Sequence, residues 1–237
     1  YDEVRGDLHV HSKYSDGTAT LEELSIWGKK MGYEYIAVCD HSKSAKYAGG
    51  LEIDDIRKKM EEIKRINDKK IGCYLIMGAE VDILPDGSLD YPDEILKEID
   101  LVLVSVHTGF KKDNTDRILK ALDNPYVHGL SHPTGRLLGQ REGYAVDIEA
   151  VIEKCAEKNK LLEINAYYER LDLYDIYLRK AKEKGVKFLI GTDAHHLGQL
   201  WMIKLGIGMA RRGWLTKEDV INTMEYNKLL EFLKSLR

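Results

Sequence analysis

The segment Val4-Arg5-Gly6-Asp7-Leu8-His9-Val10-His11 begins as a short strand-like run and ends in two histidines. Because side chains two positions apart on a strand point to the same face, both imidazoles can reach one metal ion. The segment Asp193-Ala194-His195, which follows another apolar run, repeats this spacing near the other end of the chain. Together the two segments predict that distant strand ends meet around a metal site.

Strand-like runs and helical patterns alternate along the chain with little sequence left between them. The runs are continuously apolar, which is typical of a parallel sheet covered by helices. Metal-ligand side chains follow every predicted strand except the sixth, whereas an open sheet would gather them at one switch point. We therefore expect an α/β barrel of seven strand–helix units. The predicted strands are 4–9, 35–39, 74–79, 101–106, 127–130, 161–165 and 187–190, and the predicted helices are 20–31, 53–67, 115–122, 148–158 and 174–184, with two more from about 197 and 217.

The size and composition fit one globular unit. The chain has 237 residues, of which 43% are hydrophobic, and this is enough for one sizeable core. No Ser/Gly-rich tract or long charge run marks a linker, so we expect one domain over residues 1–237. A net charge of −4 argues against binding nucleic acid by charge alone. Basic pairs such as Lys58-Lys59 occur beside acids in helical patterns, and we expect them on solvated faces.

The cysteines and the termini bear on where the protein works. Cys39, Cys73 and Cys155 are widely spaced, which predicts buried thiols in a reducing compartment and not a disulfide framework. No apolar run is long enough to span a bilayer, and the first five residues lack the features of a signal peptide. The chain does not begin with Met, so we expect a processed product or a fragment of a longer protein. These features predict a cytoplasmic protein without a membrane association.

Nine side chains of metal-ligand type follow the predicted strands, namely His9, His11, Asp16, His41, Glu80, His107, His132, Asp193 and His195. Glu80 ends an apolar run, where an unpaired carboxylate is costly and a metal pair removes that cost. Its two oxygens allow it to bridge two ions. Asp16 stands in Ser15-Asp16-Gly17, which is also compatible with an ordinary turn.

Three further polar residues near these strand ends have other predicted roles. Asp7 shares the phase of His9, so it either orients an imidazole or hydrogen-bonds at the strand end. His128 lies inside a predicted strand and is expected to be a core histidine. His196 is expected to face away from its neighbour His195.

Nine ligands exceed what one or two ions need at three or four protein ligands each, so the sequence predicts three divalent ions. Carboxylates mixed with imidazoles favour Mn²⁺, Zn²⁺ or Fe²⁺ over Mg²⁺ or Ca²⁺. Adjacent ions about 3.5–4 Å apart are used for in-line displacement at phosphorus, with a metal-bound hydroxide as the nucleophile. Such a site needs no serine or cysteine nucleophile, and we expect Ser131 to be structural.

Several of these motifs resemble those of the polymerase-and-histidinol-phosphatase (PHP) family. They are Asp7-Leu8-His9-Val10-His11-Ser12, Asp40-His41, Glu80, His107, His132 and Asp193-Ala194-His195. The resemblance implies a distorted (βα)₇ TIM-like barrel with a trinuclear site. It assigns one ion to His9, His11, Glu80 and Asp193, a second to Glu80, His107 and His132, and a third to Asp16, His41 and His195.

Longer stretches are similar to the C-terminal PHP domain of bacterial and archaeal family X DNA polymerases. They are Arg5–His11, Val81–Gly87, His132–Leu138 and Arg211–Leu215. This similarity implies Mn²⁺-dependent 3′–5′ exonuclease activity, 3′-end processing of DNA in repair, and an association with a family X polymerase module.

Candidate substrate ligands lie in the loops that follow the predicted strands. Arg136 and Arg141 follow the fifth strand, Arg170 the sixth and Lys46 the second, and an arginine can grip a phosphate bidentately. Tyr168, beside Tyr167, is placed to stack a nucleobase or to close the pocket. The expected catalytic residues are Glu80, His107, Asp193 and Arg136, the last of which would stabilise charge on the equatorial oxygens.

Three functions stay open on this evidence. The first is a phosphodiesterase that trims DNA 3′ ends, and the second is a phosphomonoesterase acting on a small metabolite such as histidinol phosphate. The third is a non-catalytic domain, against which the complete ligand set argues. The metal site serves diesters and monoesters equally, so it does not choose between the first two.

Overall fold

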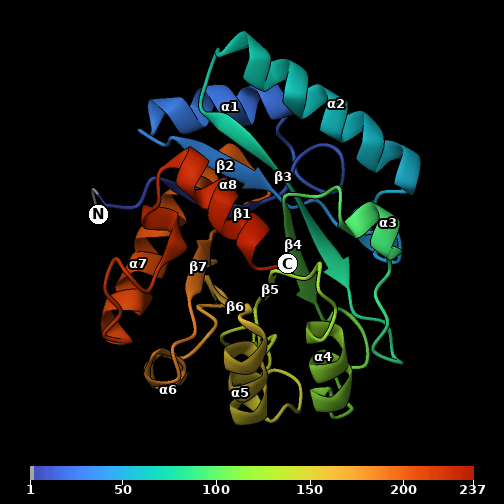
Figure 1. The fold of residues 1–237 in the computed structure, drawn as a ribbon, viewed down its shortest axis with the longest axis vertical. Coiled ribbons are helices and arrows are strands. Elements are labelled where there is room, and N and C mark those ends of the chain that lie inside the picture. The colour runs from blue at the N-terminus through green and yellow to red at the C-terminus, as the bar shows by residue number, and fades with distance from the viewer. Residues whose placement is uncertain (1–2) are drawn as a thin grey trace.

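The chain folds around a parallel sheet that curls into a barrel (Figure 1). The computed structural model describes residues 3–237, and within them seven strands are ordered β1 to β7 as in the sequence. This confirms the predicted (βα)₇ TIM-like barrel. The strands are β1 (Gly6–Val10), β2 (Tyr35–Val38), β3 (Tyr74–Asp82), β4 (Leu101–Ser105), β5 (Gly129–Leu130), β6 (Leu161–Asn165) and β7 (Phe188–Gly191).

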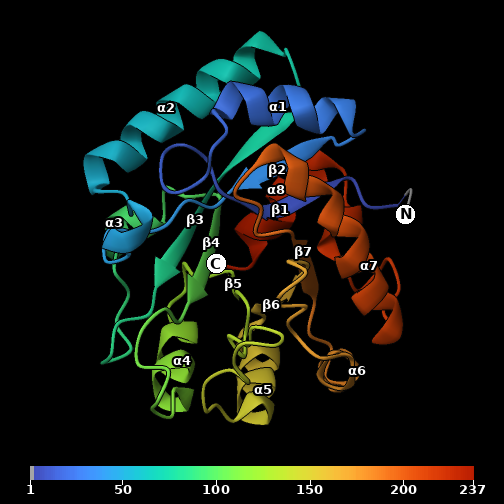
Figure 2. The same cartoon turned by 180° about the vertical axis from the view of Figure 1, so that it is seen from behind.

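Helices follow the strands and cover the outside of the barrel (Figures 1 and 2). Thr20 begins the first of them with the predicted capping box, in which its side chain and that of Glu23 each accept from the other's backbone amide. The α-helices are α1 (Leu21–Lys30), α2 (Ile53–Lys69), α3 (Asp93–Leu96), α4 (Thr115–Leu122), α5 (Ile148–Lys158), α6 (Asp175–Glu183), α7 (Ile203–Arg212) and α8 (Tyr226–Ser235), and the 3₁₀ helices are η1 (Lys46–Ala48), η2 (Leu197–Met202) and η3 (Ile221–Thr223).

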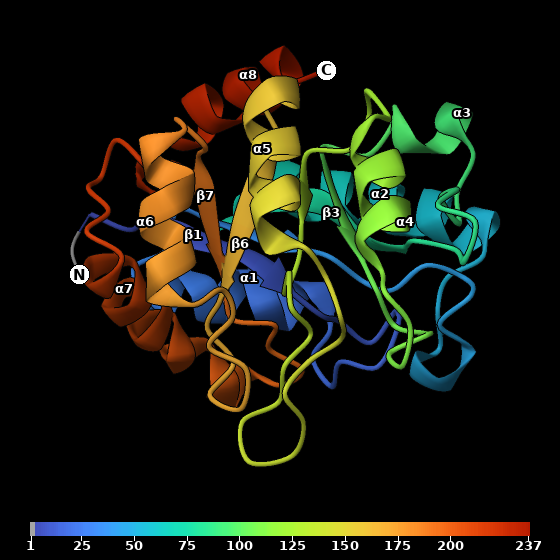
Figure 3. The same cartoon turned by 90° about the horizontal axis from the view of Figure 1, so that it is seen from below.

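Alternate side chains of each strand form two separate apolar layers. In β4, Val102 and Val104 point outward to the helices, whereas Leu101 and Leu103 point into the barrel. The interior layer also includes Leu229 and Leu233 of α8. Helix α8 therefore closes one mouth of the barrel, and Figure 3 shows it on the opposite side of the molecule from the projecting loop between β5 and α5. The other mouth is left to the loops that carry the polar residues.

The barrel is completed between β1 and β7 by side chains and single backbone contacts. The backbone links there are His11 N to Ala194 O at 2.9 Å and Asp193 N to His9 O at 2.8 Å. Asn222, from η3, adds hydrogen bonds from its side chain to Gly6 O at 2.9 Å and Ile190 O at 2.8 Å. A seven-stranded barrel thus uses a buried asparagine where an eighth strand would otherwise continue the ladder.

Asp7 supports the same closure. Its carboxylate accepts from Thr192 N at 3.0 Å and from the Thr192 hydroxyl at 2.5 Å. It also accepts from His9 N at 3.2 Å. Of its two predicted roles, the structure supports hydrogen bonding at the strand end.

Two sequence expectations were wrong. The helix predicted from about Lys217 does not begin there, because Thr216 N and its hydroxyl donate to Asp219 in a turn, and α8 starts only at Tyr226. Lys59 does not lie on a solvated face: it is buried and donates to Asp40 at 2.8 Å. The buried Asp40 carboxylate at the end of β2 requires a cation, and α2 supplies it.

The state of the cysteines agrees with the sequence prediction. Within the described residues, Cys39, Cys73 and Cys155 are free and buried, as predicted. Across residues 3–237, the helices are too short or too polar for any of them to cross a membrane.

Candidate metal centre

The nine predicted ligands lie at one mouth of the barrel. Each stands at or just after the carboxyl end of a strand, and parallel strands bring those ends to the same rim. His132 and Asp193 adopt positive φ angles of 28° and 55°, a region that non-glycine residues occupy at a cost. The backbone is thus held in a costly conformation at two points where a side chain must turn into the site.

Glu80 lies at the centre of this group, between five imidazoles. Its Oε1 lies 2.7 Å from His132 Nε2 and 3.4 Å from His107 Nε2. Its Oε2 lies 3.1 Å from His41 Nδ1, 3.6 Å from His9 Nε2 and 3.7 Å from His11 Nε2. Each carboxylate oxygen therefore faces a different set of histidines, as a bridging ligand requires.

Asp16 gathers a second set on the more exposed side of the mouth. Its oxygens lie 3.3 Å from His195 Nε2, 3.6 Å from His41 Nε2 and 3.6 Å from His11 Nδ1. The His11 ring stacks on both His41 and His195, with centroid distances of 4.5 and 4.4 Å. His11 thus takes part in two sets, which the assignment implied by the family resemblance did not include.

Asp193 completes the centre from the side of β7. Its Oδ1 lies 3.1 Å from His11 Nε2. Its Oδ2 accepts from Asn165 Nδ2 at 3.1 Å and faces the Arg170 guanidinium at 3.5 Å. One of its oxygens therefore faces the histidines while the other is held by the end of β6 and the loop after it.

The donor set fits divalent metal ions. Within the nine candidate ligands, five buried nitrogens have no hydrogen-bond partner among the described residues, and unpaired buried polar atoms are rare in folded proteins. They are His9 Nε2, His11 Nδ1, His11 Nε2, His41 Nδ1 and His132 Nδ1. Two ligand atoms that each lie about 2.1 Å from one tetrahedral ion are about 3.4 Å apart. Most of the distances given above between carboxylate oxygens and imidazole nitrogens are close to this value. Three overlapping groups could each hold an ion: His11, Asp16, His41 and His195; His9, His11 and Glu80; and His41, Glu80 and His107.

Electrostatics keep the central carboxylates ionised. Burial alone would raise the pKa of Glu80, but the surrounding histidines, His107 foremost, lower this pKa well below its usual value. Burial likewise opposes ionisation of Asp193, but the His11 imidazole, whose Nε2 lies 3.1 Å from Asp193 Oδ1, together with His9, lowers the pKa of Asp193 well below its usual value. Both groups are therefore available as anionic ligands at neutral pH.

Two buried carboxylates that sequence reasoning missed hold the histidines in place. Glu163 of β6 lies 2.6 Å from His9 Nδ1, and Asp82 of β3 lies 2.5 Å from His107 Nδ1. A carboxylate behind a ligating imidazole fixes its ring orientation and raises its basicity. Gly191 permits the contact, because a Cβ there would stand 2.3 Å from His9 Cβ. An isolated glutamate inside the apolar run 161–165 was the available signal for Glu163.

Asp40 holds the loop that follows β1. It accepts from the Ser12 amide and hydroxyl at 2.8 Å each and from the Ser15 hydroxyl at 2.7 Å. These bonds fix the chain between His11 and Asp16, which places both side chains at the mouth. The pair of Asp40 with Lys59 thus connects α2 to the metal centre.

The expected substrate ligands are distributed unevenly around the mouth. Arg170 lies beside the centre, and its buried Nη1 has no hydrogen-bond partner within residues 3–237. Arg136 does not join the cluster, because it is 6% exposed, donates to the carbonyls of Arg170 and Leu171, and packs on the Tyr174 ring. Its guanidinium therefore braces the loop after β6.

Three other expected substrate ligands lie on exposed loops. Arg141 donates to Gly135 O at 3.0 Å and packs over the Phe110 ring. Lys46, in η1, is exposed. Tyr168 is 50% exposed and packs against Tyr167.

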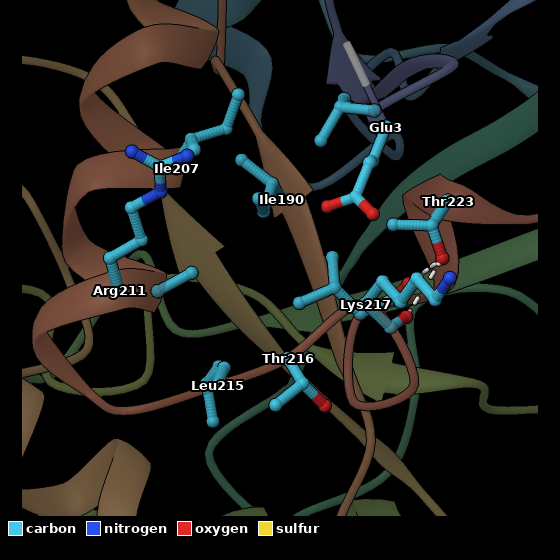
Figure 4. A pocket seen from close by; sticks show the side chains of 11 residues that line it. Glu3, Ile190, Ile207, Arg211, Leu215, Thr216, Lys217 and Thr223 are labelled. Carbon is cyan, nitrogen blue, oxygen red and sulfur yellow. Dashed lines mark hydrogen bonds between the residues drawn. The ribbon is translucent and has the colours of Figure 1, made fainter. Parts of the chain in front are cut away.

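The remaining histidines and one cavity lie outside this centre. His128 is a buried core histidine, as predicted, and its Nδ1 accepts from Val102 N at 2.9 Å. His196 is exposed and is not part of any of the three candidate ion groups. A cavity of about 110 Å³ lies between α7 and the segments around Glu3 and Lys217 (Figure 4), and none of the nine candidate ligands lines it.

A rim of imidazoles and carboxylates at one mouth of a (βα)₇ barrel defines a metal-dependent hydrolase. Residues 7–169 match the family model described as the PHP domain, and the chain belongs to this family. It is thus an enzyme of the metal-dependent phosphoesterase class, as the sequence predicted.

Relatives with known names match nearly the whole length of this chain. It is 40% identical to the DNA polymerase/3′-5′ exonuclease PolX of Bacillus subtilis (strain 168), over 98% of this chain but only 41% of that protein. It therefore spans less than half of that relative. It is 30% identical to a probable phosphatase of Thermoanaerobacter sp. (strain X514), over 96% of this chain and 94% of that protein.

A solved structure shares the fold at low sequence identity. It is the histidinol phosphate phosphatase of Lactococcus lactis, complexed with zinc, L-histidinol and phosphate. The two match with a TM-score of 0.67 and 17% identity over 90% of this chain and 95% of that one.

Proposed function

We propose that this chain is a trinuclear metal-dependent phosphodiesterase that removes nucleotides from DNA 3′ ends. The observation that carries the proposal is the set of nine ligand-type side chains around Glu80, with the unpaired Arg170 donor beside them. The 40% identity to an enzyme named as a 3′-5′ exonuclease supports DNA as the substrate.

Each group of residues has a proposed part in the reaction. Three divalent ions, Mn²⁺, Zn²⁺ or Fe²⁺, would be held by the nine ligands, and ions in such sites act as Lewis acids and lower the pKa of water. Glu80, with an oxygen toward each set of histidines, would be a ligand of two of these ions. Glu163 and Asp82 keep the His9 and His107 rings in the orientation that ligation needs.

Substrate binding is assigned to the loops around the mouth. Arg170 is the proposed phosphate ligand, because a charged donor without a partner beside the centre suits a phosphate oxygen. We propose that three residues contact the DNA strand farther from the metal centre, namely Arg141, Lys46 and Tyr168. Arg136, predicted to stabilise charge directly, is proposed instead to position Arg170 through that residue's carbonyl at 2.7 Å.

A phosphomonoesterase acting on a small metabolite is the second candidate. A relative named a probable phosphatase matches nearly its whole length. The shared fold with a histidinol phosphate phosphatase is compatible with this candidate but, at 17% identity, supports the fold alone. The metal centre would serve either ester, so only the substrate assay separates the candidates.

The test is a direct comparison of substrates. The purified chain is incubated with Mn²⁺ and a 5′-labelled single-stranded oligonucleotide, and in parallel with p-nitrophenyl phosphate and with histidinol phosphate. A ladder of 3′-shortened products that His107→Ala abolishes is the expected result. Arg179→Met should retain it, because Arg179 lies in α6 and contacts Arg212 O and the Trp214 ring instead of the candidate ligands. Phosphate release from the small esters alone would replace the proposal with the second candidate.

Metal content is a separate part of the same test. We expect about three ions per chain by elemental analysis after reconstitution, and fewer in Glu80→Ala because a bridging ligand is removed. Full turnover by Glu80→Ala would contradict the bridging role. One domain over residues 1–237, a cytoplasmic location and an association with a family X polymerase module belong to the same proposal.

A further inference from the structure

Tyr47 lies in the loop after β2, and its ring is close to two histidines of the metal centre. Its side chain is 74% exposed, yet its ring centroid lies 6.4 Å from that of His41 and 6.3 Å from that of His107. Loss of solvent around its hydroxyl, followed by the negative charges of Asp82, Glu80 and Asp16, raises the pKa of Tyr47. The ring therefore faces the mouth of the barrel.

The loop that carries Tyr47 is fixed at both ends. Ser44 N donates to Asp90 at 2.7 Å, and the Ser44 hydroxyl donates to Asp82 at 2.5 Å. Gly50 packs so closely that a Cβ there would stand 1.9 Å from Ser42 O. Leu51 N donates to His41 O at 2.9 Å. The aromatic ring is thus presented on an anchored loop, which lowers the entropy cost of stacking against it.

We propose that Tyr47 is the platform on which the nucleobase of the terminal nucleotide stacks, and that it gives the site its preference for nucleotides over phosphate esters without a base. The inference rests on the proposed function, because it places the phosphate between Glu80 and Arg170. In a nucleotide, one deoxyribose separates the base from the phosphate. The distances from the Tyr47 ring to the rings of the two histidines are comparable to that separation. Tyr168 instead packs against Tyr167, so Tyr47 is the better placed of these two exposed tyrosines.

The first experiment measures end removal from two labelled oligonucleotides that differ only in whether the 3′-terminal residue carries its base. Base stacking on an aromatic side chain is worth roughly a 5- to 140-fold change in affinity. Tyr47→Ala should therefore raise KM for the normal end by roughly tenfold and leave KM for the abasic end unchanged. Tyr47→Phe, which keeps the ring, should behave as the wild type. Tyr74→Ala is the control, because Tyr74 is a partly exposed tyrosine that stacks on Tyr226 at the start of β3.

The second experiment is independent of diester cleavage. Isothermal titration of the Mn²⁺-loaded chain compares a thymidine phosphonate with the matched deoxyribose phosphonate, neither of which can be hydrolysed as an ester. Tighter binding of the thymidine compound that Tyr47→Ala removes supports the inference, even if oligonucleotides prove not to be substrates. A base-dependent advantage that survives Tyr47→Ala, or no such advantage in the wild type, overturns it. Failure of DNA cleavage alone would overturn the proposed function and leave this inference standing.

Discussion

Replacing Asn222 with leucine should open the seam between β1 and β7. The Asn222 side chain is fully buried, donates to Gly6 O and Ile190 O, and accepts from Ile190 N at 2.7 Å. Leucine fills a similar volume, so the change removes hydrogen bonds without leaving a large cavity. Each buried backbone group left unpaired costs about 1–3 kcal/mol, so three of them predict a loss of roughly 3–9 kcal/mol. That is a large part of the total stability of about 5–15 kcal/mol that a domain has.

The assay is urea unfolding followed by circular dichroism in the presence of a chelator, because bound metal would add its own stabilisation. Asn67→Leu is the matched control: Asn67 also bonds a strand amide and carbonyl, both of Leu75, but lies away from the seam. Since β1 and β7 carry His9 and Asp193, Asn222→Leu should also weaken metal binding, and Asn67→Leu should not. A loss below about 1 kcal/mol, with metal binding unchanged, would refute the closure argument.

Three further outcomes are expected. Lys59→Met should cost about 3–5 kcal/mol in urea unfolding, because it leaves the buried Asp40 carboxylate unpaired, and adding Asp40→Asn should recover part of the loss. Glu163→Gln should weaken metal binding about 10- to 100-fold in a chelator competition without unfolding the chain, since it changes the partner of His9 Nδ1; an unchanged affinity would exclude this supporting role. Burial lowers the pKa of His128 to about 3, so the unfolded state gains a proton below about pH 6.5 that the folded state does not. Below about pH 6.5, the free energy of unfolding of the wild type should therefore fall with each pH unit by about 1.4 kcal/mol more than that of His128→Asn. Parallel pH profiles of the two proteins would contradict this.

The nine candidate ligands could be named from sequence because of where each stands along the chain. Glu80 and Asp193 each end an apolar run, and the ends of parallel strands share one rim of a barrel. The residues that support them gave weaker signals. Glu163 and Asp82 become partners of His9 and His107 only through strand register, which sequence spacing does not report.

The roles of the arginines near the mouth of the barrel were the hardest property to predict from the sequence. Arg136 and Arg170 stand in similar loops after neighbouring strands, yet the first is bound to backbone carbonyls and the second faces Asp193. Loop conformation decides this, and loops are set by contacts that sequence patterns do not encode. Tyr47 was missed for the same reason.

The sequence by itself determined the (βα)₇ barrel and placed the nine candidate ligands at strand ends, because hydrophobic periodicity and strand-end chemistry are local properties of the chain. Only the tertiary structure decided how the barrel closes through Asn222, which cation pairs with Asp40, and which donor is left unpaired at the centre. These depend on contacts between residues far apart in the chain. Their energies come from burial and geometry, which exist only once the strands and helices have packed.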